Sequence, residues 1–261
     1  MAHASFKGLR VLSLESRRAK EVEKLIRTYG GEAIVVPAMR EVGLESNEEA
    51  LEFAAGLLGG EFDLVVFLTG VGVRAMLDVV QTRFDREEII TALRKVKVAA
   101  RGAKPATALR ELKIPVHAIS EEPSTWHELL RAIDQEFGET LGDMSIAVQE
   151  YGASNPEFLA ELSIRSRNLV KVPVYQWTLP EDLQPLKECI LGLINGSIDV
   201  VLFMTAVQVI HLFQVAEQMG VVDQLHEALQ ATVVLSIGPT TSEELAHYGI
   251  RPDFEPSRPK M

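Results

Sequence analysis

The amino-acid sequence predicts an α/β fold with parallel sheets, built from two copies of one structural unit. The first observation is a repeat: segment 63–69 (DLVVFLT) returns as 199–205 (DVVLFMT), and the offset, 199 minus 63, is 136. The second is that both segments are almost continuously apolar, as expected of strands buried on both faces of a parallel sheet. The third is that strands alternate with helical patterns in each copy, which is typical of a parallel sheet covered by helices.

Each copy follows the same order of elements, and the repeat indicates where each element is expected. The offset also pairs Pro37 with Pro173, Gly60 with Gly196, Gly102 with Gly238, Leu109 with Leu245 and Ile114 with Ile250. Around the repeated strand of the first copy we expect strands at 11–14, 33–37 and 96–100, and helices at 19–29, 50–58 and 106–112. In each copy we also expect one helix between the repeated strand and the strand that follows it. In the second copy we expect strands at 146–149, 169–174 and 232–237, and helices at 156–163, 186–194 and 242–248.

Bulk composition excludes several classes of function. The net charge is -11 and the pI is about 5.1, which argues against a nucleic-acid-binding protein and against a protein that coats anionic membranes. Cys189 is the single cysteine, so an internal disulfide is impossible and a reducing cytoplasm is the expected location. Residues 1–15 lack the apolar core of a signal peptide, and the apolar stretch 200–213 is too short to span a bilayer.

The loop after the first repeated strand has the pattern G-x-G-x-x-A, with glycines at 70 and 72, which is close to a dinucleotide-binding fingerprint. The second copy carries Ala206 and Gln208 at those positions, so the fold does not require the glycines. The acid that would bind a ribose is replaced by Arg101, which would suit only NADP. Three interpretations stay open: an NADP-binding loop, a tight turn of small residues, or a site for another anion at a helix N-terminus.

The other turns that follow strands are also rich in Gly, Ser, Thr and basic residues. In parallel α/β sheets, ligands bind beyond the carboxyl ends of the strands, so these turns are the candidate anion site. For the Ser and Thr residues the alternative is ordinary helix capping, and for the Arg and Lys residues it is a solvated surface charge. The candidates are Ser16, Arg17, Arg18, Thr69, Gly70, Val71, Gly72, Arg101, Gly102, Lys104, Tyr151, Gly152, Thr205, Ala206, Val207, Gln208, Gly238, Pro239, Thr240 and Thr241.

Signals for metal or covalent catalysis are missing from the sequence. The six histidines do not have metal-ligand spacing, and neither a G-x-S-x-G elbow nor a Walker A motif occurs. Cys189 lies on an apolar stripe of a predicted helix, where a core role is favoured over a nucleophile. We therefore expect neither a metal site nor a cofactor.

Three segments together resemble the uroporphyrinogen-III synthase family. Segment 233–257 (VVLSIGPTTSEELAHYGIRPDFEPS) resembles the last strand-helix-strand of that family, with its Gly, its Thr pair and its terminal Ser. Segment 170–177 (VKVPVYQW) resembles the Val-Tyr strand that leads into its linker, and 11–39 resembles its opening unit. The order and spacing of the three segments make the resemblance specific, and it covers essentially the whole chain.

The resemblance implies two discontinuous parallel-sheet domains joined by a two-stranded linker, with the active site in the cleft between them. The chain is then expected to divide into domain one (1–39 and 181–261), domain two (45–173) and linker strands (37–44 and 174–180). The family expectation is a monomer. A transient contact with hydroxymethylbilane synthase, the enzyme that makes the substrate, is a further possibility.

The resemblance also implies the chemistry. The family closes hydroxymethylbilane, a linear tetrapyrrole rich in carboxylates, with loss of water and inversion of ring D through a spiro intermediate. The pyrrole nitrogens supply the electrons, so no cofactor is needed. The matching tyrosine here is Tyr175, expected to help the hydroxyl leave, although a tyrosine that only packs in the linker is the alternative. Thr240 and Thr241 match the Thr pair that would bind propionate or acetate. Two other functions stay open: an NADP-dependent reductase, and a non-catalytic two-lobed sensor of a small anion.

The end of the second copy also carries an expectation. In the first copy a helix with apolar residues at 126, 129, 130 and 133 follows the last turn, and the second copy stops just before its counterpart. We therefore expect a natural form that is longer by a helix of about 12 residues, close to the mean length of helices in proteins.

Overall fold

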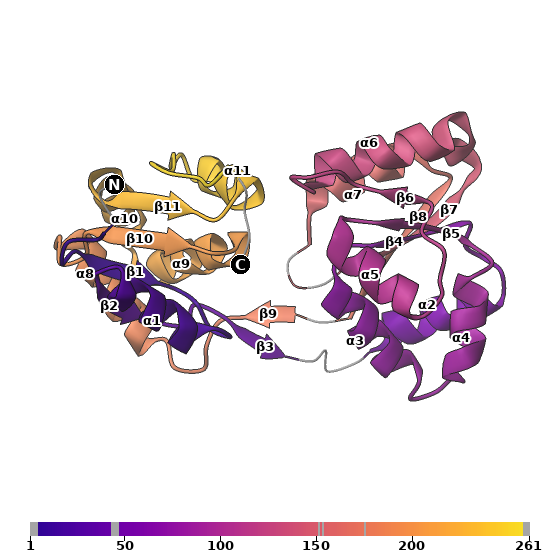
Figure 1. Ribbon diagram of the computed structural model, residues 1–261, viewed down its shortest axis with the longest axis horizontal. Helices are drawn as coiled ribbons and strands as arrows, with labels where there is room; N and C mark the ends of the chain where they lie inside the picture. The colour runs from indigo at the N-terminus through magenta and orange to yellow at the C-terminus, as the bar shows by residue number, and fades with distance from the viewer. Residues whose placement is uncertain (1–4, 43–46, 151, 153, 175, 258–261) are drawn as a thin grey trace. The chain divides into compact units, whose positions relative to one another are not determined.

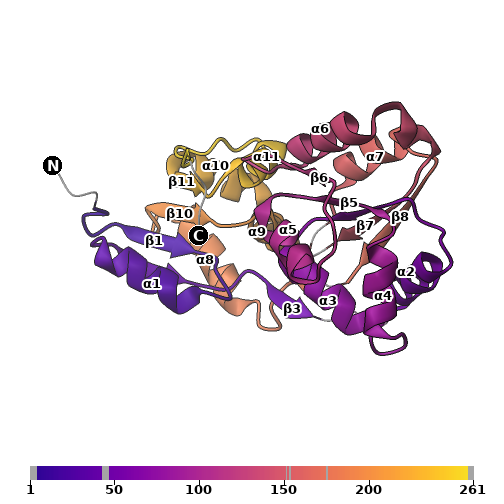
Figure 2. The same ribbon diagram turned by 45° about the vertical axis from the view of Figure 1, so that its right-hand side comes forward.

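The computed structural model describes residues 5–42, 47–150, 152, 154–174 and 176–257, and its ribbon is drawn in Figures 1 and 2. The chain forms two compact units: unit 1 comprises Met1–Arg40 and Trp177–Met261, and unit 2 comprises Glu41–Gln176. Each unit is built on its own parallel sheet. The predicted fold class, two parallel-sheet α/β units that come from an internal duplication, is therefore confirmed.

Unit 1 has a four-stranded sheet in the order β11-β10-β1-β2, with all strands parallel. Helices α8 to α11 share one core with the sheet, whereas α1 packs on β1 and β2 with a smaller apolar cluster around Val22 and Ile26. The bounds of the elements are β1 Arg10–Ser13, α1 Ala19–Thr28, β2 Glu32–Val35, α8 Gln184–Ile194, β10 Val200–Phe203, α9 Ala206–Met219, α10 Val222–Ala231, β11 Val233–Ser236 and α11 Pro239–His247.

Unit 2 has a five-stranded parallel sheet in the order β6-β5-β4-β7-β8. Helices α2 to α5 contact one another in one layer, and α6 and α7 contact each other in another (Figures 1 and 2). The bounds are α2 Glu48–Leu58, β4 Leu64–Phe67, α3 Gly70–Val80, α4 Arg86–Leu93, β5 Lys97–Ala100, α5 Ala103–Glu111, β6 Ala118–Ile119, α6 Trp126–Phe137, a 3-10 helix Gly138–Asp143, β7 Ser145–Glu150, α7 Pro156–Arg165 and β8 Asn168–Pro173.

The two segments that connect the units pair as a two-stranded sheet of β3 (Arg40–Val42) and β9 (Gln176–Thr178) (Figure 1). Both strands lie within the predicted linker segments 37–44 and 174–180. Arg40 anchors the connection on the side of unit 1, because its guanidinium donates to the Leu179 carbonyl (3.3 Å) and to Glu181 (2.8 Å). The Arg17 guanidinium lies 4.4 Å from the centre of the Trp177 ring, a cation–π contact beside the connection.

The duplication is kept almost residue for residue. Helix α8 begins 136 residues after α2 (184 minus 48), and α11 begins 136 residues after α5 (239 minus 103). The bridge between Leu235 and Phe254 has the same offset from the Ala99–Ala118 pair that joins β5 to β6. The first strands depart from this pattern, since β7 begins 135 residues after β1 (145 minus 10). The offset is 136 again at β8 (168 minus 32), so one extra residue lies between the start of β7 and the start of β8.

Two helices, rather than the single helix we expected, fill the stretch between the repeated strand and the strand after it in each unit. In unit 2, Asp85 starts the second helix, because its carboxylate accepts from the backbone N–H groups of Glu87 (2.9 Å) and Glu88 (3.0 Å). In unit 1, Gly220 ends α9 in the left-handed conformation (φ 69°), and α10 follows. A capping aspartate and a glycine that ends a helix are both local signals in the sequence, whereas the repeat of the strands indicates nothing about a second helix.

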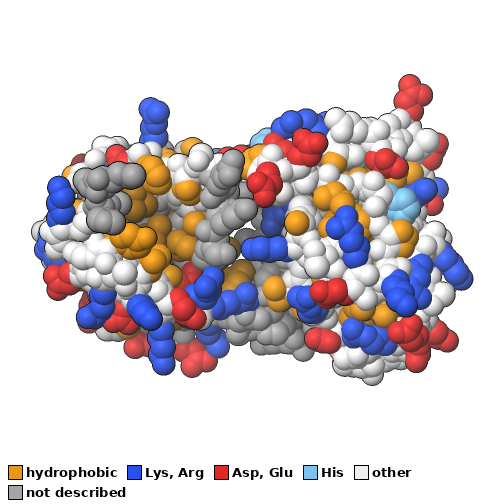
Figure 3. Space-filling model, in the orientation of Figure 1, with side chains coloured by type: hydrophobic (Ala, Val, Ile, Leu, Met, Phe, Trp, Pro, Cys, Tyr) orange, Lys and Arg blue, Asp and Glu red, His pale blue; other side chains and the backbone are white. Residues whose placement is uncertain are grey.

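The faces of the two sheets are covered to different extents. In unit 2, the apolar side of α6 contributes Leu129, Leu130 and Ile133 to a core shared with the sheet. In unit 1 the corresponding face leaves Val233 44% and Phe254 61% exposed, and hydrophobic side chains gather over β10 and β11 in the space-filling view (Figure 3). None of the helices within the described residues is both long enough and apolar enough to cross a membrane.

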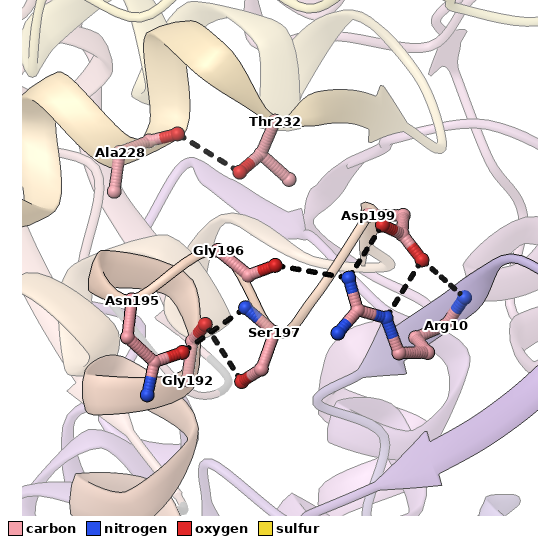
Figure 4. A network of polar contacts seen from close by, with 8 residues as sticks. All are labelled: Arg10, Gly192, Asn195, Gly196, Ser197, Asp199, Ala228 and Thr232. Atoms are coloured by element: carbon pink, nitrogen blue, oxygen red, sulfur yellow. Dashed lines mark hydrogen bonds and ion pairs between the residues drawn. The ribbon is translucent and has the colours of Figure 1, made fainter.

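An aspartate at the start of each repeated strand explains why this residue is a landmark of the duplication. In unit 1, the Asp199 carboxylate accepts from the backbone N–H of Arg10 (2.8 Å) and from its guanidinium (2.9 and 2.7 Å), which also donates to the Gly196 carbonyl (2.9 Å) (Figure 4). In unit 2, Asp63 accepts from the backbone N–H of Ser145 (2.8 Å). Each aspartate therefore joins the first residue of a neighbouring strand to the central strand.

The Asp199 contact predicts a pH dependence of stability. Hydrogen bonds from Arg10 lower the pKa of Asp199 from 3.8 to about 2. The contribution of this carboxylate is fully present above its unfolded pKa near 4, and it is lost as the pH falls through about 2. We expect Asp199→Asn to lower the melting temperature at pH 6, and we expect the difference from the unchanged protein to shrink between about pH 4 and pH 2. A difference that stays constant down to pH 2 would contradict this assignment.

Candidate functional site

The turn that follows β4 is built around Thr69, which caps α3. The Thr69 side chain accepts a hydrogen bond from the backbone N–H of Gly72 at 2.9 Å. The two glycines of the G-x-G-x-x-A pattern are both explained by close packing. A Cβ on Gly70 would lie 2.8 Å from the Lys104 carbonyl oxygen, and a Cβ on Gly72 would lie 2.3 Å from the side-chain amide of Gln149. Neither glycine therefore needs a bound nucleotide to account for it, and Val71, between them, is 46% exposed.

The two units solve this packing in opposite ways. In unit 1, Gln208 on α9 is fully buried, accepts from the Met204 N–H (2.7 Å) and donates to the Leu14 carbonyl on the β1 side (3.1 Å). In unit 2, the glutamine lies on the strand instead: Gln149 of β7 occupies the space beside Gly72 and donates to the Glu150 carbonyl (2.7 Å). Both polar groups of the Gln208 side chain therefore bond within unit 1, and its backbone N–H donates to the Thr205 cap.

This exchange predicts an energetic coupling between Gly72 and Gln149. We expect Gly72→Ala to lower the free energy of unfolding by about 1–3 kcal/mol, because the new methyl group overlaps the buried amide. Gln149→Ala in the same chain should recover most of that loss, a coupling that urea unfolding of the double-mutant cycle measures. Gly142→Ala is the control, because a Cβ there meets nothing within 4 Å. Strictly additive effects would show that the two residues do not share this space.

The turn after β5 contains Arg101, an arginine whose side chain has no partner in the described part of the chain. Arg101 is half-buried, and burial lowers the pKa of its guanidinium below the usual value. Over the described residues no hydrogen bond or ion pair reaches the Arg101 guanidinium. Gly102 comes next with φ 83°, a left-handed conformation that favours glycine, and α5 starts after it; Lys104 in its first turn is exposed. A desolvated cation at the start of a helix is suited to binding an anion.

The turn after β7 is only partly described. Gly152 is half-buried and adopts φ 88°. Tyr151, a predicted binding residue, and Tyr175, the predicted catalytic residue, both lie outside the described residues. Their roles stay predictions based on the sequence.

In unit 1, the turn after β1 has its own acidic residue. Glu15 is 4% exposed and accepts from the backbone N–H groups of Arg17 (3.1 Å) and Arg18 (3.2 Å). Ser16 donates to the Met39 carbonyl at 2.6 Å. The hydroxyl and both amides therefore stabilise the turn. The Arg17 guanidinium contacts the Trp177 ring, and the exposed Arg18 side chain can meet a ligand.

The remaining turns of unit 1 start α9 and α11. Thr205 caps α9 and accepts from the Gln208 N–H at 3.4 Å; Ala206 beside it is half-buried, and Val207 is buried. At the start of α11, Thr240 is exposed, whereas Thr241 is 3% exposed and donates its backbone N–H to the Gly238 carbonyl (3.0 Å).

A network of hydroxyl groups stabilises the start of α11 beside Gly238 and Pro239. Ser236 donates to the Gly238 carbonyl at 3.0 Å, and Ser242 donates to Glu255 while its oxygen lies 2.9 Å from the Ser236 hydroxyl. Of the Thr pair, Thr240 is therefore the more accessible to a ligand.

Sequence reasoning missed three polar residues at these turns: Glu15, Ser120 and Gln149. Glu15 is not among the predicted residues, although its short spacing to two amides is a capping signal. The Ser120 side chain is buried beside the turn after β5, and the sequence gives no local signal for it. No group of three or more His, Cys, Asp or Glu side chains that could hold a metal ion occurs among the described residues.

Comparison with known proteins gives consistent results. The family model described as uroporphyrinogen-III synthase HemD matches residues 20–261. An uncharacterized Bacillus subtilis protein, YjjA, is 27% identical over 255 residues, covering 97% of this chain and 92% of its own length. A crystallised mutant uroporphyrinogen III synthase of Thermus thermophilus has a TM-score of 0.76 and 26% identity, covering 97% of this chain and 94% of that one. The Helicobacter pylori synthetase shares the fold at 13% identity with a TM-score of 0.50, covering 97% of this chain and 94% of its own.

Proposed function

Because the chain belongs to the uroporphyrinogen-III synthase family, we propose that it converts hydroxymethylbilane into uroporphyrinogen III. The proposed reaction removes the terminal hydroxyl as water, passes through a spiro intermediate and closes the ring with ring D inverted. The pyrrole nitrogens of the substrate supply the electrons for each step, so the protein has to position the flexible chain and assist the leaving hydroxyl. This reaction class needs no cofactor.

Arg101 is the observation that carries the proposal. A charge removed from water without a partner is strongly unfavourable, so a half-buried guanidinium that no carboxylate of the described residues reaches favours a ligand as its partner. The proposed substrate offers many carboxylates. Lys104 adds positive charge at the same turn, Arg17 and Arg18 add it at the turn after β1, and Thr240 adds an exposed hydroxyl. Such groups bind carboxylates through charge-assisted hydrogen bonds.

Tyr175 is the proposed acid that assists the leaving hydroxyl. A phenol with a pKa near 10 keeps its proton at neutral pH and can donate it, or a hydrogen bond, to the departing oxygen. Support comes from the duplication: the counterpart of Tyr175 in the first copy is Met39 (175 minus 136), so the repeated unit does not need a tyrosine at this position.

The test is the product isomer. Hydroxymethylbilane made in the assay from porphobilinogen by hydroxymethylbilane synthase is supplied to the chain, and the porphyrins obtained after oxidation are separated by chromatography. We expect isomer III to exceed the amount in a control with heat-denatured protein. If isomer I alone forms in both samples, the chain is not this enzyme, and a non-catalytic sensor of small anions becomes the better interpretation.

The NADP-dependent reductase has lost its main support. Gly70 and Gly72 are accounted for by the Lys104 carbonyl and the Gln149 amide, and Arg101 is accounted for equally well by a carboxylate ligand. A change in NADPH fluorescence on mixing with the chain would restore that interpretation.

We propose further that the enzyme acts as a cytoplasmic monomer and receives its substrate in a transient contact with hydroxymethylbilane synthase. Sedimentation of the chain alone and of its mixture with that enzyme tests both points.

A further inference from the structure

The start of α5 in unit 2 contains a polar group that the described protein leaves unsatisfied. Ser120 follows β6, its side chain is 4% exposed, and its hydroxyl has no hydrogen-bond partner among the described residues. The hydroxyl lies 4.0 Å from the position that a Cβ would take on Gly102, the residue at which α5 begins. A buried hydroxyl without a partner is unfavourable, so its position at a helix N-terminus points to a missing acceptor.

Other groups at this point are also available to an anion. The backbone N–H groups of Ala103 and Lys104 lie in the first turn of α5 and have no carbonyl partner within the described chain. The pairing of β5 with β6 ends at Ala100 and Ile119, and continuing that register by one residue brings Arg101 beside Ser120. A guanidinium, a hydroxyl and free amides are all donors, and together they match the acceptor oxygens of a carboxylate.

Unit 1 provides an internal comparison, because the start of α11 is the counterpart of the start of α5. There Ser236, Ser242 and Glu255 bond to one another and to the Gly238 carbonyl. The offset of 136 places Ala100, Ala106 and Ile119 at these positions in unit 2, none of which has a polar side chain.

Conversely, the positions of Arg101 and Ser120 are taken in unit 1 by Ile237 and Pro256. The fold therefore requires neither polar residue. In unit 1 the side chains at the helix start bond to one another and to Gly238, whereas in unit 2 the Ser120 hydroxyl has no partner among the described residues.

We propose that Ser120, together with Arg101 and the first amides of α5, binds one carboxylate of the substrate. This inference rests on the proposed function for the identity of the ligand. Access requires movement of Ser124, whose hydroxyl lies 2.7 Å from the Cβ position of Gly102 and donates to the Glu121 carbonyl at 3.2 Å. Rotation of this half-buried side chain uncovers Ser120. Glu121 and Glu122 are exposed, where water and salt screen their repulsion of the ligand.

The test compares Ser120→Ala with Ser145→Ala. Ser145 is a similarly buried serine of unit 2 (5% exposed). It begins β7, at the amino ends of the strands and away from the turns that follow them, and it accepts from the Asn168 amide at 3.3 Å. We expect Ser120→Ala to raise the KM for hydroxymethylbilane about tenfold or more, as for a lost hydrogen bond to a charged group, while the melting temperature holds or rises. Ser145→Ala should lower the melting temperature and leave KM unchanged.

The outcomes separate this subsite from the proposed function. If the unchanged protein makes isomer III and Ser120→Ala has an unaltered KM, the subsite is wrong and the function stands. If the unchanged protein makes no isomer III, the function is wrong, and binding of uroporphyrin III, followed by its fluorescence, decides the subsite. Weaker binding by Ser120→Ala than by Ser145→Ala would then support the subsite. Equal binding, or none by any of the proteins, would overturn it.

Discussion

Replacing Tyr175 with phenylalanine is expected to lower the turnover of hydroxymethylbilane by roughly ten- to a thousandfold, the range found when a general acid or an oxyanion donor is removed. The substitution deletes one hydroxyl and keeps the ring. Because this hydroxyl is proposed to donate to the departing oxygen, its loss should lower kcat more than it raises KM. The melting temperature should not change. Turnover is measured as the initial rate of isomer III formation under saturating substrate.

A second tyrosine provides the control for this experiment. Tyr29 ends α1 and is 46% exposed, so Tyr29→Phe removes a phenol that has no proposed part in the reaction. Its turnover should equal that of the unchanged protein. Equal turnover for Tyr175→Phe as well would remove Tyr175 from the mechanism and leave substrate positioning as the main contribution of the protein.

Most of the fold could be predicted because its signals are local and are repeated. The offset of 136 residues aligned two copies of each pattern, so a weak signal in one copy was supported by the other. Helix α6 was predicted with its observed bounds, 126–137, because its apolar face is regular; its start at Thr125 and Glu128 is also a capping box. The division between α3 and α4 was missed, since it depends on the single cap at Asp85.

The candidate site could be predicted only in outline. The rule that ligands bind at the carboxyl ends of parallel strands selects these turns as a group, but it does not separate residues that face a ligand from residues that hold the turn together. Gln208 illustrates the difficulty, because its partner is the carbonyl of Leu14, 194 residues away. Ser120 lies near Gly102 only because β6 pairs with β5, a contact between residues that no local pattern connects.

The glycine pattern shows how the duplication corrects a motif-based interpretation. A single copy with Gly70 and Gly72 resembles a nucleotide-binding loop. The structure shows that the second glycine makes room for Gln149, and unit 1 reaches a similar arrangement with Gln208 on the helix and Leu14 at the end of the strand. Packing of a buried amide is therefore a sufficient reason for Gly72. It does not account for Arg101, whose side chain has no partner among the described residues.

Arg101→Met is expected to raise the KM for hydroxymethylbilane by about ten- to a hundredfold, since a hydrogen bond to a charged group contributes about 1.5–3 kcal/mol and about 1.4 kcal/mol corresponds to a factor of ten. Methionine keeps an unbranched side chain in the same space without the charge. Because the guanidinium is desolvated and has no partner among the described residues, its removal should leave the melting temperature unchanged or higher. Removing a residue that binds the ligand should therefore keep or raise the melting temperature, whereas removing one that stabilises the fold should lower it.

Arg94→Met provides the matched control for Arg101→Met. Arg94 precedes β5, whereas Arg101 follows it, so the two arginines lie near opposite ends of the same strand. The Arg94 guanidinium donates to the carbonyl groups of Leu112 (2.8 Å) and Lys113 (3.3 Å) at the end of α5, so Arg94→Met should lower the melting temperature and leave KM unchanged. If Arg101→Met instead behaves like Arg94→Met, the Arg101 side chain supports the fold, and the anion site at the start of α5 has to be abandoned.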